Sequence, residues 1–193
     1  MKKIIVFDVD WVITDSGAWK EAIIQRILEE HGLFDIPGVA EIFWIGLNRI
    51  ILLDRIYDVK PFDKALVLAE INRDLFIQES QVSLNLDTFE FIKNNYKKYD
   101  FFTNTSLPKR SLQMIFADLD IGKYFMELLA YDDGSKKENI EYVIQVHWVK
   151  PENILFMDDK QSHIDAVKPT WVLTLLFEQD WVSLEQKVNN IFQ

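Results

Sequence analysis

Four groups of polar residues are spaced along the sequence, and three of them directly follow an apolar run. The groups are, in chain order, Asp8 with Asp10, Thr103 with Asn104, Lys136 with Lys137, and Asp158 with Asp159. The runs IIVF, YDFF and ILFM precede the first, second and fourth groups and predict buried strands. In an open α/β sheet the carboxyl ends of the strands line the crevice where ligands bind. The sequence therefore predicts a catalytic site at that edge.

The first group carries the chemistry of a metal-assisted nucleophile. Residues two apart in an extended segment point the same way, so Asp8 and Asp10 direct their carboxylates toward one place. Two like charges there require a cation, and Mg²⁺ fits because it prefers oxygen ligands and leaves positions for waters and a phosphate. One carboxylate can attack phosphorus while its neighbour moves a proton. Taken alone, the pattern is also typical of a solvated turn.

The second and third groups are weaker signals by themselves. Thr103 and Asn104 offer a hydroxyl, an amide and backbone N–H groups for phosphoryl oxygens, or they open a turn. Lys136 and Lys137 begin a predicted helix, where the positive end of the helix dipole disfavours cations. That placement predicts a lysine that neutralises charge in a transition state. Two surface lysines are the alternative interpretation.

The fourth group adds two adjacent carboxylates that require a metal to lie together. Asp158 and Asp159 follow the third apolar run, whereas Ser162 is predicted to cap the next helix with Asp165 in the acidic position of a capping box. None of the three histidines has the spacing of a zinc site, so no ligand role is predicted for them.

The pattern of elements predicts an α/β fold with a helical insert. Residues 17–82 show helical spacing, divided by glycine and proline into about four helices. Beyond residue 83, strands and helices alternate, which is typical of a doubly wound, Rossmann-like parallel sheet. We expect a core domain of residues 1–16 and 83–193, interrupted by a helical domain of residues 17–82. The predicted strands after the insert are 99–103, 127–131, 153–157 and 171–176, and the predicted helices are 88–95, 108–118, 137–147, 162–167 and 184–192.

Composition limits the classes of function. A chain of 193 residues with 49% hydrophobic content can bury a full core. The net charge of −10 is spread along the chain without a basic face, which argues against nucleic acid as a partner. The sequence contains no cysteine, no signal-peptide core and no membrane-length apolar stretch. We expect a cytoplasmic protein without membrane contact, as a monomer or weak homodimer, and core positions for Trp148, Trp171 and Trp181.

The four groups together carry a family resemblance. The segments VFDVDWVITDS, FFTNTS, SKKENI and ILFMDDKQSHIDA, in that order, resemble the four motifs of the haloacid dehalogenase superfamily of phosphohydrolases. The match covers nearly the whole chain. The insert between the first two motifs resembles the helical cap of the branch that includes β-phosphoglucomutase and phosphoglycolate phosphatase. This resemblance implies a Mg²⁺-dependent phosphatase that acts on a small phosphorylated metabolite.

The resemblance also implies a role for each matching residue. It implies that Asp8 is the nucleophile that forms an aspartyl phosphate, and that Asp10 is the general acid and base, with its backbone carbonyl on the Mg²⁺ ion. Thr103 and Asn104 are implied to bind the phosphoryl group. Lys136 is preferred over Lys137 as the lysine of the third motif because of its separation from Pro151.

In the last motif, Asp159 matches the direct metal ligand of the family and Asp158 a supporting acid.

The chain departs from the family pattern near the first motif. Trp11 stands where the family usually has glycine, so we expect its indole to contact the substrate or to narrow the entrance. In the insert, Arg49 of the segment GLNR can bind a second anionic group or can be a helix-surface arginine. Lys20 replaces the cap histidine of the mutases, which weakens a phosphomutase function. A non-catalytic binding module on the same fold is the remaining alternative.

Overall fold

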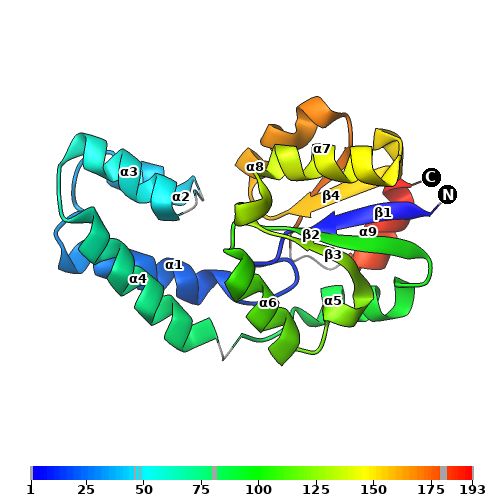
Figure 1. Ribbon diagram of the computed structural model, residues 1–193, viewed down its shortest axis with the longest axis horizontal. Helices are drawn as coiled ribbons and strands as arrows, with labels where there is room; N and C mark the ends of the chain where they lie inside the picture. Colours follow the sequence, from blue (N-terminus) through cyan, green and yellow to red (C-terminus); the bar gives the residue numbers. More distant parts are fainter. Residues whose placement is uncertain (1, 46, 48, 80–81, 179–181, 193) are drawn as a thin grey trace. The chain divides into compact units, whose positions relative to one another are not determined.

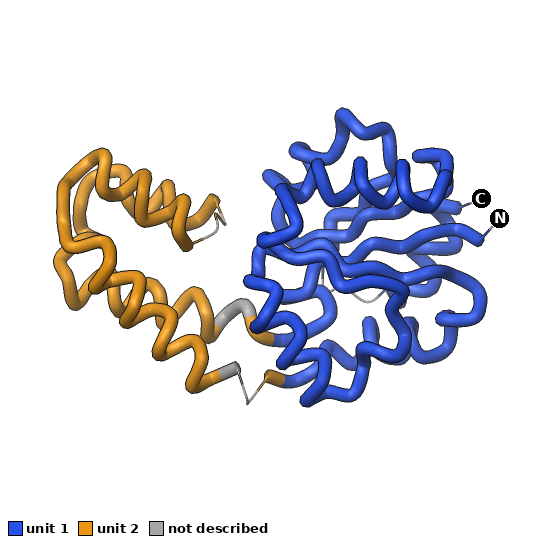
Figure 2. Tube along the Cα trace, in the orientation of Figure 1, with its two compact units in different colours: residues 1–15, 83–193 blue, residues 16–82 orange. Residues whose placement is uncertain are grey.

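The computed structural model describes residues 2–45, 47, 49–79, 82–178 and 182–192. The chain divides into two compact units, one made of Met1–Asp15 with Ser83–Gln193 and the other of Ser16–Val82 (Figure 2). The first boundary lies one residue before the one expected from the sequence, and the second, between residues 82 and 83, coincides with it. That the second unit acts as a cap stays a prediction.

The first unit is built on a sheet of five parallel strands in the order β3-β2-β1-β4-β5 (Figure 1). The strands are β1 (Lys3–Phe7), β2 (Tyr99–Asn104), β3 (Phe125–Leu129), β4 (Ile154–Asp158) and β5 (Leu173–Leu176). The predicted doubly wound α/β fold is therefore confirmed. Because all strands run the same way, their carboxyl ends meet at one edge. The strand order reverses beside β1, which is where such sheets form a ligand crevice.

Helices cover both faces of this sheet (Figure 1). One face carries α7 (Lys136–His147) and α8 (Gln161–Val167), and the other carries α5 (Leu86–Asn95), α6 (Lys109–Asp118) and α9 (Leu184–Ile191). Short 3₁₀ turns occur at Gly122–Tyr124, Tyr131–Asp133, Pro151–Asn153 and Lys168–Thr170. Both faces are buried, which explains why the strands are almost continuously apolar instead of alternating.

The alternation of side chains along each strand sorts the core into two clusters. Val6, Phe102 and Phe156 belong to a buried cluster that includes apolar residues of α7 and α8. On the opposite face, the ring of Phe101 lies 5.4 Å from that of Phe7 and 6.1 Å from that of Phe125. Successive side chains of a strand point to opposite faces of the sheet. The residue two positions after Val6, Phe102 or Phe156 therefore points to the same face, the one covered by α7 and α8.

The residues at those positions are polar. Two positions beyond Val6, Phe102 and Phe156 the chain has Asp8, Asn104 and Asp158, respectively. The period of the strand therefore brings two acids and an amide to the α7 and α8 side of the sheet, at the carboxyl edge.

The structure corrects the expected positions of two tryptophans. The side chains of Trp148 and Trp171 are 86% and 83% exposed, so the prediction that they pack in or beside the core was wrong. Trp148 ends α7 and Trp171 ends a 3₁₀ turn, both with left-handed backbone at φ 51° and 63°. A left-handed residue at a helix end projects away from the preceding turn. Trp181 lies outside the described residues.

The predicted start of α8 was also wrong in detail. The helix begins at Gln161 with Lys160 as its N-cap, so Ser162 lies inside the first turn and is not the N-cap. Asp165 accepts a hydrogen bond from the Gln161 side chain and pairs with Lys168 instead of completing a capping box.

The second unit contains four helices among its described residues, as expected for the insert. They are α1 (Gly17–Glu30), α2 (Val39–Trp44), α3 (Arg49–Val59) and α4 (Lys64–Glu79). Leu28, Leu53 and Ile71, from three of the helices, are fully buried in one apolar cluster. Within the part of the chain that the structure describes, no helix has the length and apolar character needed to cross a membrane.

The aromatic side of the sheet offers a test of packing. Replacing the fully buried Phe101 by Ala should lower the free energy of unfolding by about 3–5 kcal/mol, because the ring loses several aromatic contacts and leaves a cavity. Denaturant titration followed by circular dichroism measures the change. Met126→Ala in β3, where the side chain is 62% exposed, should change stability by less than about 0.5 kcal/mol. Equal effects of the two substitutions would contradict this description of the core.

Candidate active site

Two neighbouring strands bring the central carboxylates together. Asp8 follows β1, and its backbone N–H donates to the carbonyl oxygen of Met157 in β4 at 2.8 Å. Asp158, the last residue of β4, is fully buried, and Asp8 is nearly so. The pairing of β1 with β4 is therefore sufficient to place both carboxylates at the carboxyl edge of the sheet.

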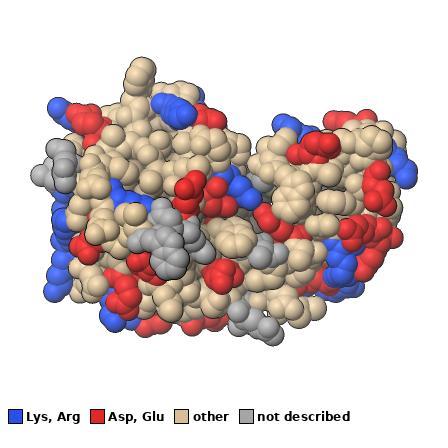
Figure 3. Space-filling model, turned by 180° about the vertical axis from the view of Figure 1, so that it is seen from behind, with Lys and Arg blue, Asp and Glu red and all other residues tan. Residues whose placement is uncertain are grey.

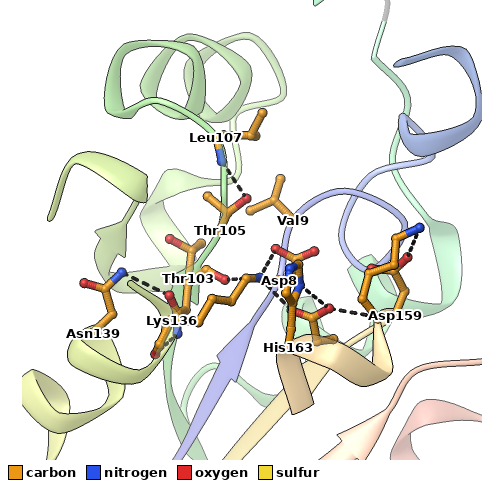
Figure 4. Close-up of polar contacts among 12 residues, drawn as sticks. Asp8, Val9, Thr103, Thr105, Leu107, Lys136, Asn139, Asp159 and His163 are labelled. Carbon is orange, nitrogen blue, oxygen red and sulfur yellow. Dashed lines mark hydrogen bonds and ion pairs between the residues drawn. The ribbon is translucent and has the colours of Figure 1, made fainter. Parts of the chain in front are cut away.

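The first residue of α7, Lys136, places its ammonium group between these carboxylates (Figure 4). Its Nζ lies 2.7 Å from Asp8 Oδ1, 2.6 Å from Asp158 Oδ2 and 2.9 Å from the Asn104 carbonyl oxygen. Three acceptors thus take the three N–H bonds of the ammonium. Lys137 instead is exposed and pairs with Glu141 at 3.4 Å. Of the two lysines that the sequence left open, Lys136 is the one that reaches Asp8.

A capping box fixes the start of α7 and therefore the position of Lys136. The hydroxyl of Ser135 accepts from the backbone N–H of Glu138, and the Glu138 carboxylate accepts from the backbone N–H of Ser135 at 2.8 Å. The sequence Ser-x-x-Glu carries this signal, which the sequence analysis did not use. The box determines which residue becomes the first of the helix, and so which lysine faces the strands.

Thr103 and Asn104 are fully buried and make contacts inside the fold. The Thr103 hydroxyl donates to the Leu129 carbonyl oxygen at 3.1 Å, and Asn104 Nδ2 donates to the Lys136 carbonyl oxygen at 2.8 Å. Asn139 Nδ2 donates to Asn104 Oδ1 at 3.0 Å. In this arrangement the amide of Asn104 anchors α7, and the hydroxyl hydrogen of Thr103 is donated inside the fold. That these two residues bind the phosphoryl group stays a prediction.

Asp158 has two further partners, one of which the sequence analysis missed. Lys160 donates its backbone N–H to Asp158 Oδ1 at 2.9 Å. Nδ1 of His163 lies 2.9 Å from Oδ1 and 3.1 Å from Oδ2 of the same carboxylate. The spacing Asp-x₄-His from a strand end to the first turn of a helix was the available signal.

Asp159 completes a group of three carboxylates. Asp8, Asp158 and Asp159 each present an oxygen such that these atoms lie within 4.8 Å of one another. Asp159 is only partly buried, and the one ion pair found for it among the described residues is with Lys160 Nζ at 3.8 Å. Lys136 therefore compensates Asp8 and Asp158 closely, whereas the nearest ion-pair partner of Asp159 among the described residues is at 3.8 Å.

The pKa values follow this uneven compensation. Burial, with the charges of Asp8 and Asp158, raises the pKa of Asp159 from 3.8 to about 7. Burial likewise raises the pKa of Asp8 to about 6, although Lys136 opposes the change. Burial also acts to raise the pKa of Asp158, but Lys136 and His163 outweigh it and lower the value. Asp159 is thus the carboxyl group with the least compensation, whereas Asp8 is nearly fully buried and shares the Lys136 ammonium with Asp158.

The donor set fits a hard divalent cation. Carboxylate oxygens are the ligands that Mg²⁺ prefers, and it is commonly held by one or two of them together with waters and a substrate phosphate. Burial is the largest cause of the raised pKa values of Asp8 and Asp159, and repulsion by the charge of Asp158 adds to both. A cation between them would relieve that repulsion.

The remaining candidates lie outside this cluster of contacts. Asp10 is close enough for its charge to raise the pKa of Asp8. Trp11 is partly buried and has left-handed backbone with φ 67°, the conformation that favours glycine. Arg49 is the first residue of α3 and belongs to the second unit. Gly46 and Asn48 of the predicted recognition segment lie outside the described residues.

Comparison with known proteins agrees with this geometry. Residues 5–175 match the model of the haloacid dehalogenase-like hydrolase family. The chain is 25% identical over 188 residues to the phosphoglycolate phosphatase of Pseudomonas putida, covering 89% of this chain and 68% of that protein.

Solved structures share the fold. A haloacid dehalogenase-like hydrolase from Streptococcus pneumoniae superposes with a TM-score of 0.74 at 14% identity, covering 97% of this chain and 90% of that one. A hydrolase from Bacillus subtilis, solved with bound magnesium, gives a TM-score of 0.69 at 17% identity, covering 99% and 98%.

The sheet is parallel, and an aspartate paired with a lysine lies at its carboxyl edge, as in an α/β protein whose ligand site is at that edge. The family match extends over most of the sequence, so the chain belongs to the haloacid dehalogenase-like hydrolase family. The resemblance seen in the four sequence motifs is thereby confirmed.

The raised pKa values predict how the stability of the metal-free protein depends on pH. A carboxyl group whose pKa is higher in the folded than in the unfolded state contributes stability that is full below the unfolded pKa and is lost as the pH rises through the folded pKa. For Asp8 and Asp159 this window runs from 3.8 to about 6 and about 7, respectively. The melting temperature in EDTA should fall across this window, and Mg²⁺ should reduce the fall by binding the ionised groups.

Thermal melts over this pH range, with EDTA and with Mg²⁺, measure the effect. Asp159→Asn should flatten the pH dependence in EDTA and weaken stabilisation by Mg²⁺, whereas the exposed Asp165→Asn should do neither. Identical wild-type curves with and without Mg²⁺ would contradict the metal site.

Proposed function

We propose that this hydrolase is a Mg²⁺-dependent phosphatase that cleaves small phosphomonoesters with Asp8 as the nucleophile. The observation that carries the proposal is the contact of 2.7 Å between Lys136 Nζ and Asp8 Oδ1, beside the carboxylates of Asp158 and Asp159. A carboxylate held by one ammonium in a nearly dry place keeps its nucleophilic oxygen oriented and poorly hydrated.

In the first step, an oxygen of Asp8 attacks phosphorus and the ester bond to the leaving oxygen breaks. Asp10 gives its proton to that oxygen, so the alcohol leaves neutral. The product is an acyl phosphate on Asp8. In the second step, Asp10 takes a proton from water as the water attacks phosphorus, which releases inorganic phosphate and restores the Asp8 carboxylate.

Lys136 contributes charge to both steps. Its ammonium group contacts Asp8 directly and is fixed on its other sides by Asp158 and the Asn104 carbonyl oxygen. A cation that is already oriented stabilises the developing negative charge without reorganisation at the moment of reaction. Asn104 and Asn139 act in this proposal as supports of α7. A phosphoryl contact by Thr103 would require its hydroxyl to leave the Leu129 carbonyl oxygen.

Asp8 and Asp159 would hold the Mg²⁺ ion, with the backbone carbonyl of Asp10 as a further ligand. When bound, Mg²⁺ would neutralise charge on the carboxylates and on phosphoryl oxygens. The pKa of Asp159, raised to about 7, supports this assignment, because burial and the charges of Asp8 and Asp158 disfavour the ionised carboxylate that a cation would stabilise. The magnesium bound in the Bacillus subtilis structure agrees with it.

The substrate that we propose is a small phosphorylated metabolite with a second anionic group, for which phosphoglycolate is the first candidate to test. The name of the Pseudomonas putida relative supports this choice. Arg49 is the proposed partner of the second anionic group. Acidic and basic side chains are interspersed on the face in Figure 3, where the described residues form no continuous basic surface for a nucleic acid. A cytoplasmic location and a monomeric or weakly dimeric state stay predictions.

Substitution of the nucleophile tests the reaction. Asp8→Asn keeps the size of the side chain but removes the nucleophilic carboxylate, so hydrolysis of phosphoglycolate and of an aryl phosphate should fall by at least about 10³-fold. Phosphate release with Mg²⁺ measures the rate. Asp165→Asn, an exposed carboxylate on α8, serves as the matched control and should keep the wild-type rate. Equal rates for wild type and Asp8→Asn would remove Asp8 from the mechanism.

Trp11 is the candidate determinant of substrate range. Because Trp11 has a backbone conformation that glycine adopts more readily, Trp11→Gly should be accommodated without refolding of the turn. Removing the indole should change KM and broaden the range of accepted phosphomonoesters more than it lowers kcat. A screen of phosphorylated metabolites with steady-state kinetics measures both. An unchanged substrate range together with an unchanged KM would show that the indole makes no substrate contact.

A further inference from the structure

His163 has a defined contact that the proposed reaction does not yet use. Its Nδ1 lies between the two oxygens of the Asp158 carboxylate, at 2.9 and 3.1 Å. Two carboxylate oxygens can only accept, so Nδ1 must carry the hydrogen. The ring is therefore fixed as a donor on its Nδ1 side. It approaches from the first turn of α8, below Asp8 in the view of Figure 4.

The surroundings of Asp158 show what this donor does. Oδ2 accepts from Lys136 at 2.6 Å and Oδ1 accepts from the Lys160 backbone at 2.9 Å, while His163 contacts both oxygens. The carboxylate is thus held by three donors from three directions. Asp158 is fully buried, so no water replaces a donor that is removed.

This arrangement separates the roles of the two adjacent acids. Asp158 is occupied by donors and acts as the anion that fixes the Lys136 ammonium beside Asp8. Within the described part of the chain, the nearest ion-pair partner of Asp159 is Lys160, at 3.8 Å. Without the His163 donor, two donors instead of three would hold the Asp158 carboxylate, so it would fix the Lys136 ammonium less firmly. The ammonium would then pair more closely with Asp8 and withdraw that carboxylate from the cation.

We propose that His163 is a positioning residue that locks the Asp158 carboxylate onto Lys136 and thereby leaves the metal to Asp8 and Asp159. The inference rests on the proposed function. Substitution of His163 by Asn would mimic this donor closely, because Asn branches at Cγ as His does and carries an N–H donor in the position of Nδ1. An apolar residue of similar volume, Leu, lacks any donor.

The first experiment measures metal binding without substrate. The metal-free protein is titrated with Mn²⁺, and binding is followed by electron paramagnetic resonance. His163→Leu should bind Mn²⁺ about 10- to 100-fold more weakly, as expected for the loss of an outer-shell hydrogen bond. His163→Asn should recover most of the affinity. In steady-state kinetics His163→Leu should lower kcat while KM changes little, because the change acts through Lys136 and not through substrate contacts. Asp165→Asn on the same helix should match the wild type in both measurements.

The second experiment is independent of metal and activity. Nitrogen NMR of histidine-labelled, metal-free wild type should show His163 protonated on Nδ1, with the signal assigned by its loss in His163→Leu. An Nδ1 without a proton would overturn the inference, and so would wild-type Mn²⁺ affinity and kcat in a folded His163→Leu variant. Wild type that binds no Mn²⁺ and hydrolyses no phosphomonoester would defeat the proposed function, while the Nδ1 signal would still decide whether His163 holds Asp158.

Discussion

The buried ammonium group of Lys136 lies between Asp8 and Asp158, and the candidate site depends on that shared contact. Each carboxylate belongs to a different strand, and the lysine belongs to a helix that follows a third, so one charge joins β1, β4 and α7. Removing one partner from a buried ion pair leaves the other charge uncompensated, at a cost of about 3–5 kcal/mol. Two further interactions fix the position of Lys136. They are the capping box at the start of α7 and the hydrogen bond from the Asn104 amide to the Lys136 carbonyl oxygen.

One cation is insufficient for the charge collected here. Asp8, Asp158 and Asp159 bring three carboxylates together, and Asp10 is close enough to act on Asp8. The protein thus folds with an excess of negative charge at the place where the proposed phosphoryl transfer would use a divalent cation. Burial raises the pKa values of Asp8 and Asp159, whereas Lys136 and His163 together outweigh burial at Asp158 and lower its pKa. Adjacent residues of identical type therefore have opposite pKa shifts, and their surroundings alone make the difference.

Trp11 shows a local conflict of the kind that occurs at functional sites. A left-handed backbone costs a residue with a β-carbon about 1–2 kcal/mol, and glycine avoids that cost. A large aromatic residue in this conformation, three positions after the proposed nucleophile, is not explained by turn geometry alone. Contact of its indole with a substrate would account for its presence. Trp148 and Trp171 have the same backbone conformation but are exposed at helix ends, and nothing in the structure explains their choice of side chain.

The sequence by itself determined the class of fold and most of the chemistry. The alternation of strands and helices predicted the parallel sheet. Apolar runs of strand length followed by acids predicted the edge at which Asp8 and Asp158 meet, because strand periodicity is local and the carboxyl ends of parallel strands share one edge. The helical insert was predictable for the same reason. Element boundaries were less so, since the end of a strand or helix depends on caps and on left-handed residues such as Trp171, whose conformation sequence periodicity does not report.

Only the tertiary structure decided which like residues differ in role. Lys136 and Lys137 are identical in type and adjacent, but the rotation of α7 turns one into the core and the other to solvent. Likewise, the contact of His163 with Asp158 depends on where α8 lies against the end of β4, and the inward turn of Asn104 depends on the packing of α7. Sequence spacing supplies the candidates at a strand end, whereas the choice among them follows from helix packing, which brings together residues far apart along the chain.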